Sequence, residues 1–183
     1  MDRIRLLKKD DASERAQELL EQVQQTFGKI PNIFKVMANS PAVLQSYLNF
    51  SGALSTGVLD VKIAERIALF ISQQNDCEYC LSAHSMLAKN AGLSQEEILQ
   101  ARRGLSANQR AQSALFFAGS VYQNKGQVSV SDLASIREEG FSDEEVLEII
   151  GHVNLTNLTN FINNVAQTTV DFPRAEPLET VPC

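Results

Sequence analysis

Apolar residues recur every three or four positions along most of the chain. This spacing is typical of helices that bury one face and expose the other. No segment shows the two-residue alternation of a strand bounded by hairpin turns. The hydrophobic pattern therefore predicts an all-α fold.

Capping residues, glycines and prolines divide this pattern into separate helices. We expect a Ser, Asp or Asn at most helix starts and a Gly at several helix ends. In the first half of the chain, helices are predicted from Asp10 or Asp11 to about Phe27, from Phe34 to Ala38, from Pro41 to near Gly57, from about Val61 to Gln74 and from about Cys77 to Ala91. The next helix follows a capping box of Ser94 and Glu97, a long one runs from about Asn108 to Asn124, and a short one begins shortly after Ser131. The last helix follows a capping box of Ser142 and Glu145 and runs from Asp143 to about Thr168.

The predicted helix 61–74 differs from the others because it is apolar nearly all round between Ile63 and Ile71. Such a helix is buried on most sides, either in the core or between protomers. We therefore expect a homo-oligomer.

The bulk properties fit one domain, residues 1–183, with 169–183 as an extended C-terminal tail. The chain has 183 residues, of which 44% are hydrophobic and 21% charged, and its net charge is −6. Scattered basic residues in an acidic chain argue against a nucleic-acid partner, and no apolar run is long enough for a membrane span. The N-terminus has no apolar signal region, so we expect a cytoplasmic protein, in which Cys183 is a bystander.

The strongest chemical signal is the pattern Glu-x11-Cys-x2-Cys-x3-His, formed by Glu65, Cys77, Cys80 and His84. On a helix, the two cysteines and the histidine share one face. In a reducing compartment such a pair is more often catalytic, redox-active or metal-binding than a structural disulfide. The hypothesis requires Glu65, on the preceding helix, to fold back toward the thiols.

These residue types suit thiol redox chemistry, because the thiolate is the form that cleaves a peroxide bond. A helix N-terminus favours ionisation of Cys77, whereas proximity to His84 favours ionisation of Cys80. Glu65 can orient His84 and accept its proton. After the attacking sulfur becomes a sulfenic acid, the second thiol condenses with it to a disulfide, which an outside dithiol reduces.

The pattern resembles the signature of the AhpD-like alkylhydroperoxidases in the carboxymuconolactone decarboxylase superfamily. The segments Pro31–Pro41 and Asn160–Ala166, followed by Val170–Pro173, are similar to its peroxidase-related branch. The resemblance implies an AhpD-like helical bundle that forms trimers or hexamers. It also implies a peroxidase for hydroperoxides, supported by a lipoylated or thioredoxin-like dithiol protein, with no cofactor.

By this resemblance Cys80 matches the peroxide-attacking cysteine and Cys77 the resolving one, with Glu65 and His84 as the proton relay. The chain departs from the family at Tyr79, where AhpD itself has a histidine. The decarboxylases of the superfamily lack the cysteine pair, which argues against lactone decarboxylation.

Two other interpretations use the same cysteines. One is a dithiol–disulfide oxidoreductase or redox sensor without strong peroxidase activity. The other is a non-catalytic helical assembly protein in which the four residues bind structural zinc, although the chain offers no second ligand pair.

A polar stripe also marks the last predicted helix, where His152 lies near Asn154, Asn157, Asn160 and Asn164. Spacings of three and four residues predict a polar seam against another helix. The alternative is that this stripe borders the active-site cleft.

Overall fold

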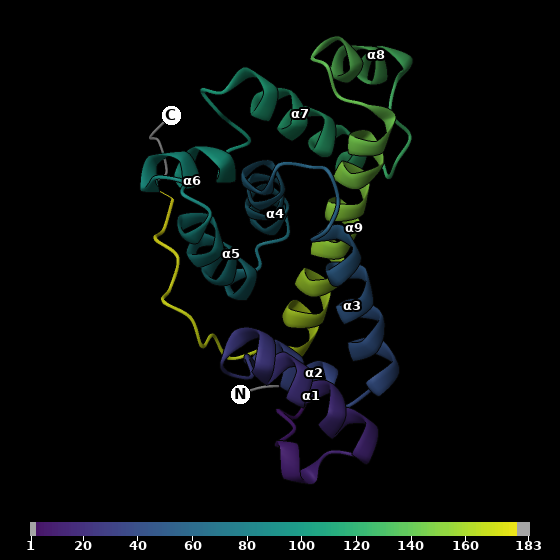
Figure 1. The fold of residues 1–183 in the computed structure, drawn as a ribbon. Coiled ribbons are helices and arrows are strands. Elements are labelled where there is room, and N and C mark those ends of the chain that lie inside the picture. The colour runs from purple at the N-terminus through teal and green to yellow at the C-terminus, as the bar shows by residue number, and fades with distance from the viewer. Residues whose placement is uncertain (1–2, 179–183) are drawn as a thin grey trace.

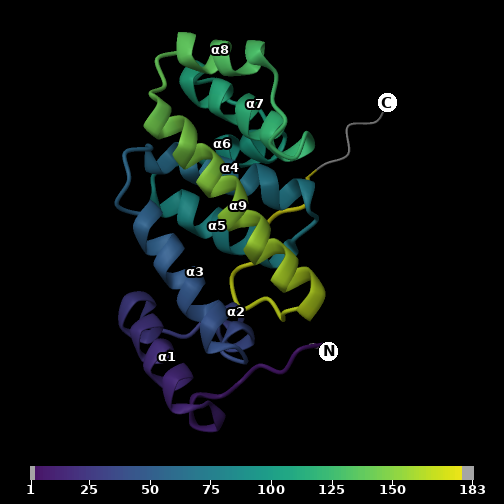
Figure 2. The ribbon, with the colours of Figure 1, turned by 90° about the vertical axis from the view of Figure 1, so that its right-hand side faces the viewer.

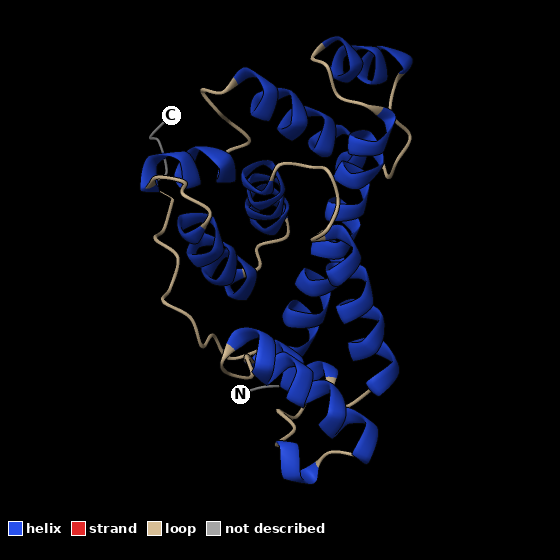
Figure 3. Ribbon diagram, viewed as in Figure 1, coloured by secondary structure: helices blue, strands red, loops and turns tan. Residues whose placement is uncertain are grey.

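The structure is a computed structural model that describes residues 3–178, and in this range it contains α-helices, one short 3₁₀-helix at Lys9–Asp11 and no strand (Figures 1 and 3). The prediction of an all-α fold is confirmed. None of the described helices has the length and apolar character needed to cross a bilayer. The helices are α1 (Glu14–Phe27), α2 (Asn32–Met37), α3 (Pro41–Leu54), α4 (Val61–Gln74), α5 (Glu78–Asn90), α6 (Gln95–Arg102), α7 (Gln109–Gln123), α8 (Val130–Glu138) and α9 (Asp143–Ala166).

Helix α4 occupies the centre of the molecule, where it packs against α5, α6, α7 and α9 (Figure 1). It begins as predicted, because Asp60 Oδ1 accepts hydrogen bonds from the backbone N–H groups of Lys62 (2.9 Å) and Ile63 (3.2 Å). Its side chains Ile67 and Ile71 are fully buried. The apolar surface of α4 is thus explained by the core of one chain, and oligomer formation stays a prediction without support from this helix.

Most helix boundaries follow the local signals. Both predicted capping boxes are present, and Gly28 ends α1 in the left-handed conformation with φ 70°. The predicted start of the first helix is wrong, because the cap is Ser13, whose Oγ accepts from the Ala16 N–H. Asp10 and Asp11 lie instead in the preceding 3₁₀ turn.

Helix α9 runs diagonally along most of the molecule (Figure 2) and contacts α2, α3, α4, α5 and α7. The segment that follows it has no regular structure and passes α5 toward α6 (Figure 1). Along this path the Ala175 N–H donates to Ser82 Oγ at 3.2 Å, and Arg102 donates to the Glu176 carbonyl. The tail therefore lies on the surface of its own chain as far as it is described; Cys183 is outside the described residues.

Candidate active site

The two cysteines lie at the turn that joins α4 to α5. Asp76 makes this turn with a positive φ of 48°, and Cys77 follows as the N-cap of α5. The Cys77 sulfur accepts the Cys80 N–H at 3.4 Å, in the place where a Ser or Asp side chain usually caps a helix. Both cysteines are free thiols and are buried, with 0% and 3% of their surface exposed.

A carboxylate–imidazole pair lies beside the thiols. Glu65 projects from α4 and His84 from α5, and His84 Nδ1 is 2.9 Å from Glu65 Oε2. Their side chains are 16% and 24% exposed, so the pair is partly shielded from water. Helix α4 thus folds back against α5 as the hypothesis required, and the structure brings all four predicted residues into one region.

Helix α9 supplies polar contacts to Cys80 that the sequence analysis missed. Asn163 Nδ2 donates to Cys80 Sγ at 3.2 Å, and Thr159 Oγ1 is 4.0 Å from the same sulfur. The Thr159 hydroxyl donates its proton to the Thr156 carbonyl at 2.9 Å, so its oxygen faces the sulfur as an acceptor. The only sequence signal was the four-residue spacing of Thr159 and Asn163, which places both on one helix face.

The environment pushes the pKa values of the two thiols apart. The hydrogen bond that Cys77 donates to Cys80 is the largest cause of a raised Cys77 pKa, and burial raises it further. Burial alone also raises the Cys80 pKa, but the Cys77 hydrogen bond, the charge of His84 and the Asn163 amide outweigh it and lower this pKa to about 7. Cys80 is therefore the more acidic of the two thiols, and the dipole argument for Cys77 is outweighed because the Cys77 thiol donates to Cys80.

The protonation state of His84 complements that thiolate. Burial lowers its pKa, but the charge of Glu65, the hydrogen bond to Glu65 and the Cys80 thiolate together raise it above its usual value of 6.5. An imidazolium held by a carboxylate can stabilise a neighbouring thiolate and can deliver a proton to a departing oxygen. The site thus brings together a thiol with a lowered pKa, an imidazole with a raised pKa and a second thiol.

Tyr79, which replaces the histidine of AhpD, takes no part in this group. Its hydroxyl donates to Asp171 Oδ1 at 2.8 Å and accepts the Ile33 N–H at 3.1 Å. Its ring packs edge-to-face against Phe172, with centroids 5.5 Å apart. Burial raises the pKa of Tyr79, so the phenol stays protonated and ties α2 and the tail to the thiol-bearing helix.

We expect Tyr79→Phe to destabilise the protein by about 1–3 kcal/mol, because the buried Ile33 N–H loses its acceptor. The free energy of unfolding from urea denaturation measures this loss. Tyr122→Phe is the matched control, since it removes a partly buried phenol that donates to Asn75 Oδ1 and touches no thiol. An unchanged stability together with a large fall in thiol reactivity would show instead that Tyr79 acts in the chemistry.

Two cavities adjoin the site. One of about 100 Å³ is lined by Cys80 and Asn163. The other, of about 270 Å³, is lined by Glu65 and His152. Both are lined by Phe27, Tyr47, His84, Leu87 and Thr159, so they lie side by side.

The Asn-rich stripe of α9 divides into two parts. Asn75, at the end of α4, donates to Asn157 at 2.8 Å and to Asn160 at 2.9 Å, while Asn164 donates to the Asn75 carbonyl at 2.7 Å. This part is the polar seam that the spacing predicted. His152 does not belong to it, because it faces the larger cavity beside the site.

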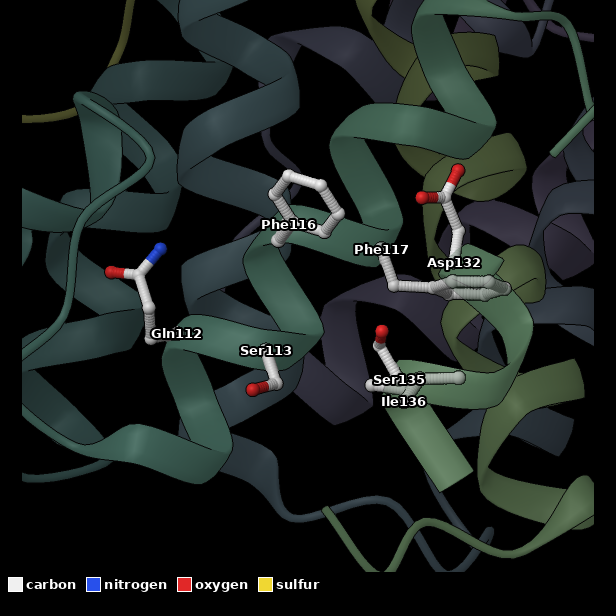
Figure 4. Close-up of a pocket in the computed structure, with 7 residues that line it drawn as sticks. All are labelled: Gln112, Ser113, Phe116, Phe117, Asp132, Ser135 and Ile136. Atoms are coloured by element: carbon white, nitrogen blue, oxygen red, sulfur yellow. The ribbon is translucent and has the colours of Figure 1, made fainter. Parts of the chain in front are cut away.

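A further cavity, of about 200 Å³, lies between α7 and α8 and is separate from the thiols (Figure 4). Asp132 is its one charged side chain, and this carboxylate accepts from Ser120 Oγ at 2.7 Å and from the Ser129 N–H at 3.3 Å. Phe116 is 62% exposed at its rim. Because its carboxylate is occupied in capping α8, this cavity is no candidate for the chemistry.

A metal centre of three or more His, Cys, Asp or Glu ligands is not found among residues 3–178. The Glu65 carboxylate is bonded to His84 and the Cys80 sulfur to Asn163. We therefore assign no ligand set for zinc.

An all-α fold that carries a CxxC pair beside a Glu–His pair is the combination expected of AhpD-like proteins. Residues 41–118, which contain all four site residues, match the carboxymuconolactone decarboxylase family. The comparison with curated proteins found no match. The resemblance to the carboxymuconolactone decarboxylase superfamily is confirmed over residues 41–118.

Solved structures show the same fold. An AhpD core, an uncharacterized peroxidase-related protein from Ralstonia eutropha JMP134, is 23% identical with a TM-score of 0.84, over 93% of this chain and 92% of its own. A peroxidase-related protein from Silicibacter sp. TM1040 is 24% identical with a TM-score of 0.76, over 89% and 88%. The debrominase Bmp8, solved with 2,3,4-tribromopyrrole, is 17% identical with a TM-score of 0.77, over 93% and 92%.

Proposed function

We propose that this protein is a thiol-dependent peroxidase that reduces hydroperoxides through a Cys77–Cys80 disulfide cycle. The observation that carries the proposal is the Cys80 thiol, whose pKa is lowered to about 7 at the wall of a cavity. A second thiol and an imidazolium lie next to it. The peroxidase-related names of two structural neighbours agree with this assignment.

The first step consumes the thiolate. The Cys80 sulfur attacks the terminal oxygen of the peroxide, an S–O bond forms, and the O–O bond breaks. The electron pair leaves on the alkoxide oxygen, which takes a proton from the His84 imidazolium and departs as an alcohol. Glu65 stabilises the charged imidazole before this transfer and orients it through the bond at Nδ1.

The second step uses the neighbouring thiol. The Cys77 sulfur attacks the Cys80 sulfenic acid, a disulfide forms, and the hydroxyl group leaves as water with the proton of Cys77. An external dithiol then reduces the disulfide and is itself oxidised. We propose a lipoylated or thioredoxin-like protein as this donor, a homo-oligomeric trimer or hexamer as the active form, and the cytoplasm as the location.

We expect the single-turnover rate with peroxide to have a bell-shaped dependence on pH. Thiolate is present above the Cys80 pKa of about 7, so the rate falls as the pH drops below it. The rate also falls at high pH, where His84 loses its proton; because the pKa of His84 is raised by Glu65 and Cys80, this limb lies at higher pH than for a free imidazole. Rapid mixing with an organic hydroperoxide across the pH range measures both limbs.

The Cys77→Ala variant tests the cause of the lowered Cys80 pKa. It removes the thiol that donates to Cys80, so the acid limb is expected to move to higher pH. Asn154→Ala on the outer side of α9 is the control, since Asn154 bonds only the Ile150 carbonyl of its own helix. An acid limb that stays in place in Cys77→Ala would contradict the assigned cause of the low pKa.

The alternative is dithiol–disulfide exchange without strong peroxidase activity. The position of Tyr79 favours it, because the phenol is bonded to Asp171 and supplies no second base. The two functions differ in rate: exchange predicts that Cys80 reacts with peroxide no faster than a small free thiol does at the same thiolate fraction. Rapid-mixing kinetics with hydrogen peroxide and with an organic hydroperoxide separate them.

A further inference from the structure

The larger cavity extends from Thr159 and His84, which neighbour Cys80, to a second polar position on α9. Thr159 lines the end beside Cys80, and His152 lines the cavity seven residues earlier on the same helix. At 1.5 Å per residue these two positions are about 10 Å apart along the helix axis. Helix α9 therefore sets the spacing between His152 and Thr159, whose hydroxyl oxygen is 4.0 Å from the Cys80 sulfur.

The surface between these ends is mostly apolar. Two serine hydroxyl groups there are already engaged: Ser51 is hydrogen-bonded to Tyr47, and Ser55 Oγ donates to the Gly52 carbonyl at 2.8 Å. The apolar lining consists of Phe27, Leu54, Leu59, Val61, Ala64, Ala68, Leu87 and Leu155. Such walls favour an organic group over a chain of waters.

His152 is the titratable group of this cavity that has no hydrogen-bond partner among the described residues. Among residues 3–178, none forms a hydrogen bond with its imidazole. Burial lowers the pKa of His152, and the charge of His84 lowers it too, against the opposing charges of Glu148 and Glu65. A neutral imidazole offers one donor and one acceptor to a ligand.

The loop between α3 and α4, at the His152 end of the cavity, is hydrogen-bonded to α9. The Glu148 carboxylate, one turn before His152 on α9, accepts the N–H groups of Val58 (2.9 Å) and Leu59 (2.7 Å). A side chain at Gly57 would collide with this carboxylate. The wall opposite His152 is thus fixed before any ligand arrives.

We propose that the larger cavity binds the organic part of a hydroperoxide and that His152 hydrogen-bonds a neutral polar group, a hydroxyl or a carbonyl, at the end of the cavity about 10 Å along α9 from Thr159. This inference rests on the proposed peroxidase function and names the substrate class for the same site. His152 forms and breaks no covalent bond; it selects the substrate. A carboxylate is disfavoured at this position because Glu65 lines the same cavity.

The volume agrees with a substrate of this size. An apolar cavity of about 150 Å³ is large enough for benzene. The cavity beside His152 holds about 270 Å³, which leaves room for an aromatic ring and a substituent. The reacting peroxide then occupies the smaller cavity, at Cys80.

The test compares two probes of nearly equal shape: 4-tert-butylcumene hydroperoxide and its analogue with a 2-hydroxypropan-2-yl group in place of the tert-butyl group. We expect kcat/KM to be about tenfold higher for the hydroxylated probe, the effect of one hydrogen bond. His152→Phe keeps a planar ring without a hydrogen-bonding atom and is expected to lower this ratio to about one. His152→Gln restores a donor and an acceptor and is expected to recover part of it.

Asn154→Ala is the control on the same helix and should keep the ratio of the unmodified protein. A ratio near one in the unmodified protein, or an unchanged ratio in His152→Phe, would overturn the proposal. If the unmodified protein reduced no peroxide, the proposed function would fail by itself. Calorimetry then tests the cavity alone, with the two alcohols that carry a hydroxyl group in place of the hydroperoxide group of each probe. The alcohol with the second hydroxyl group is expected to bind more tightly. His152→Phe should abolish this difference in affinity, because the difference comes from the hydrogen bond with His152.

Discussion

Replacing Cys80 with serine is expected to reduce peroxide turnover by at least about a thousandfold, because the serine hydroxyl is not ionised near neutral pH and cannot replace the thiolate. The change should be visible both in steady-state assays with a dithiol donor and in the single-turnover reaction. Serine is close in size to cysteine, so the buried pocket between Thr159 and Asn163 is retained.

The companion variant Cys77→Ala is expected to behave differently. It keeps the attacking sulfur, so one equivalent of peroxide is consumed, after which Cys80 accumulates as sulfenic acid that a sulfenic-acid reagent can label. Full turnover in Cys80→Ser would discard the assignment of the attacking sulfur. Sustained turnover in Cys77→Ala with a dithiol protein would show that Cys77 is not the resolving thiol.

Neutralising Glu65 is expected to have the second largest effect. In Glu65→Gln the imidazole loses the charge that holds its proton, so the pKa of His84 falls and the Cys80 thiolate loses its cation. We expect kcat/KM at pH 7 to fall by about 10- to 100-fold. Part of this loss should be recovered at higher pH, where Cys80 ionises without help.

The combination of Glu65→Gln with His84→Asn tests whether these residues act as one unit. The double variant should be little worse than His84→Asn alone, because Glu65 acts through the imidazole. Glu97→Gln is a control carboxylate, since Glu97 pairs with Arg66 at 2.7 Å in the capping box of α6 and lines neither cavity at the thiols. Strict additivity of the two site variants would contradict the relay.

The sequence was most informative where chemistry is local. Asp60, Ser94 and Ser142 cap the helices they were predicted to cap, because a capping bond joins residues two or three positions apart. The same holds for the thiols and His84, which lie at the N-cap and in the first two turns of α5. Even the pairing with Glu65 could be expected, since consecutive helices joined by a short turn pack against each other.

The contacts made by distant segments could not be predicted in this way. Asn163 reaches Cys80 from 83 residues away, and Asp171 reaches Tyr79 from 92 residues away. Asn163 belongs to a run of asparagines in which nothing local separates the residue at the sulfur from those that bond Asn75. The Asn163 amide adds to the effects of Cys77 and His84 in lowering the Cys80 pKa, and this distant contribution could not be predicted from the sequence.

The bond from Tyr79 to Asp171 also affects how the protein is made. A chain emerging from the ribosome exposes both cysteines long before the residues that cover them have been synthesised. Until Asp171 and Phe172 dock against Tyr79, the thiols lack one wall of their pocket. The nascent protein therefore depends on its surroundings, rather than on its own fold, to keep its sulfur atoms reduced.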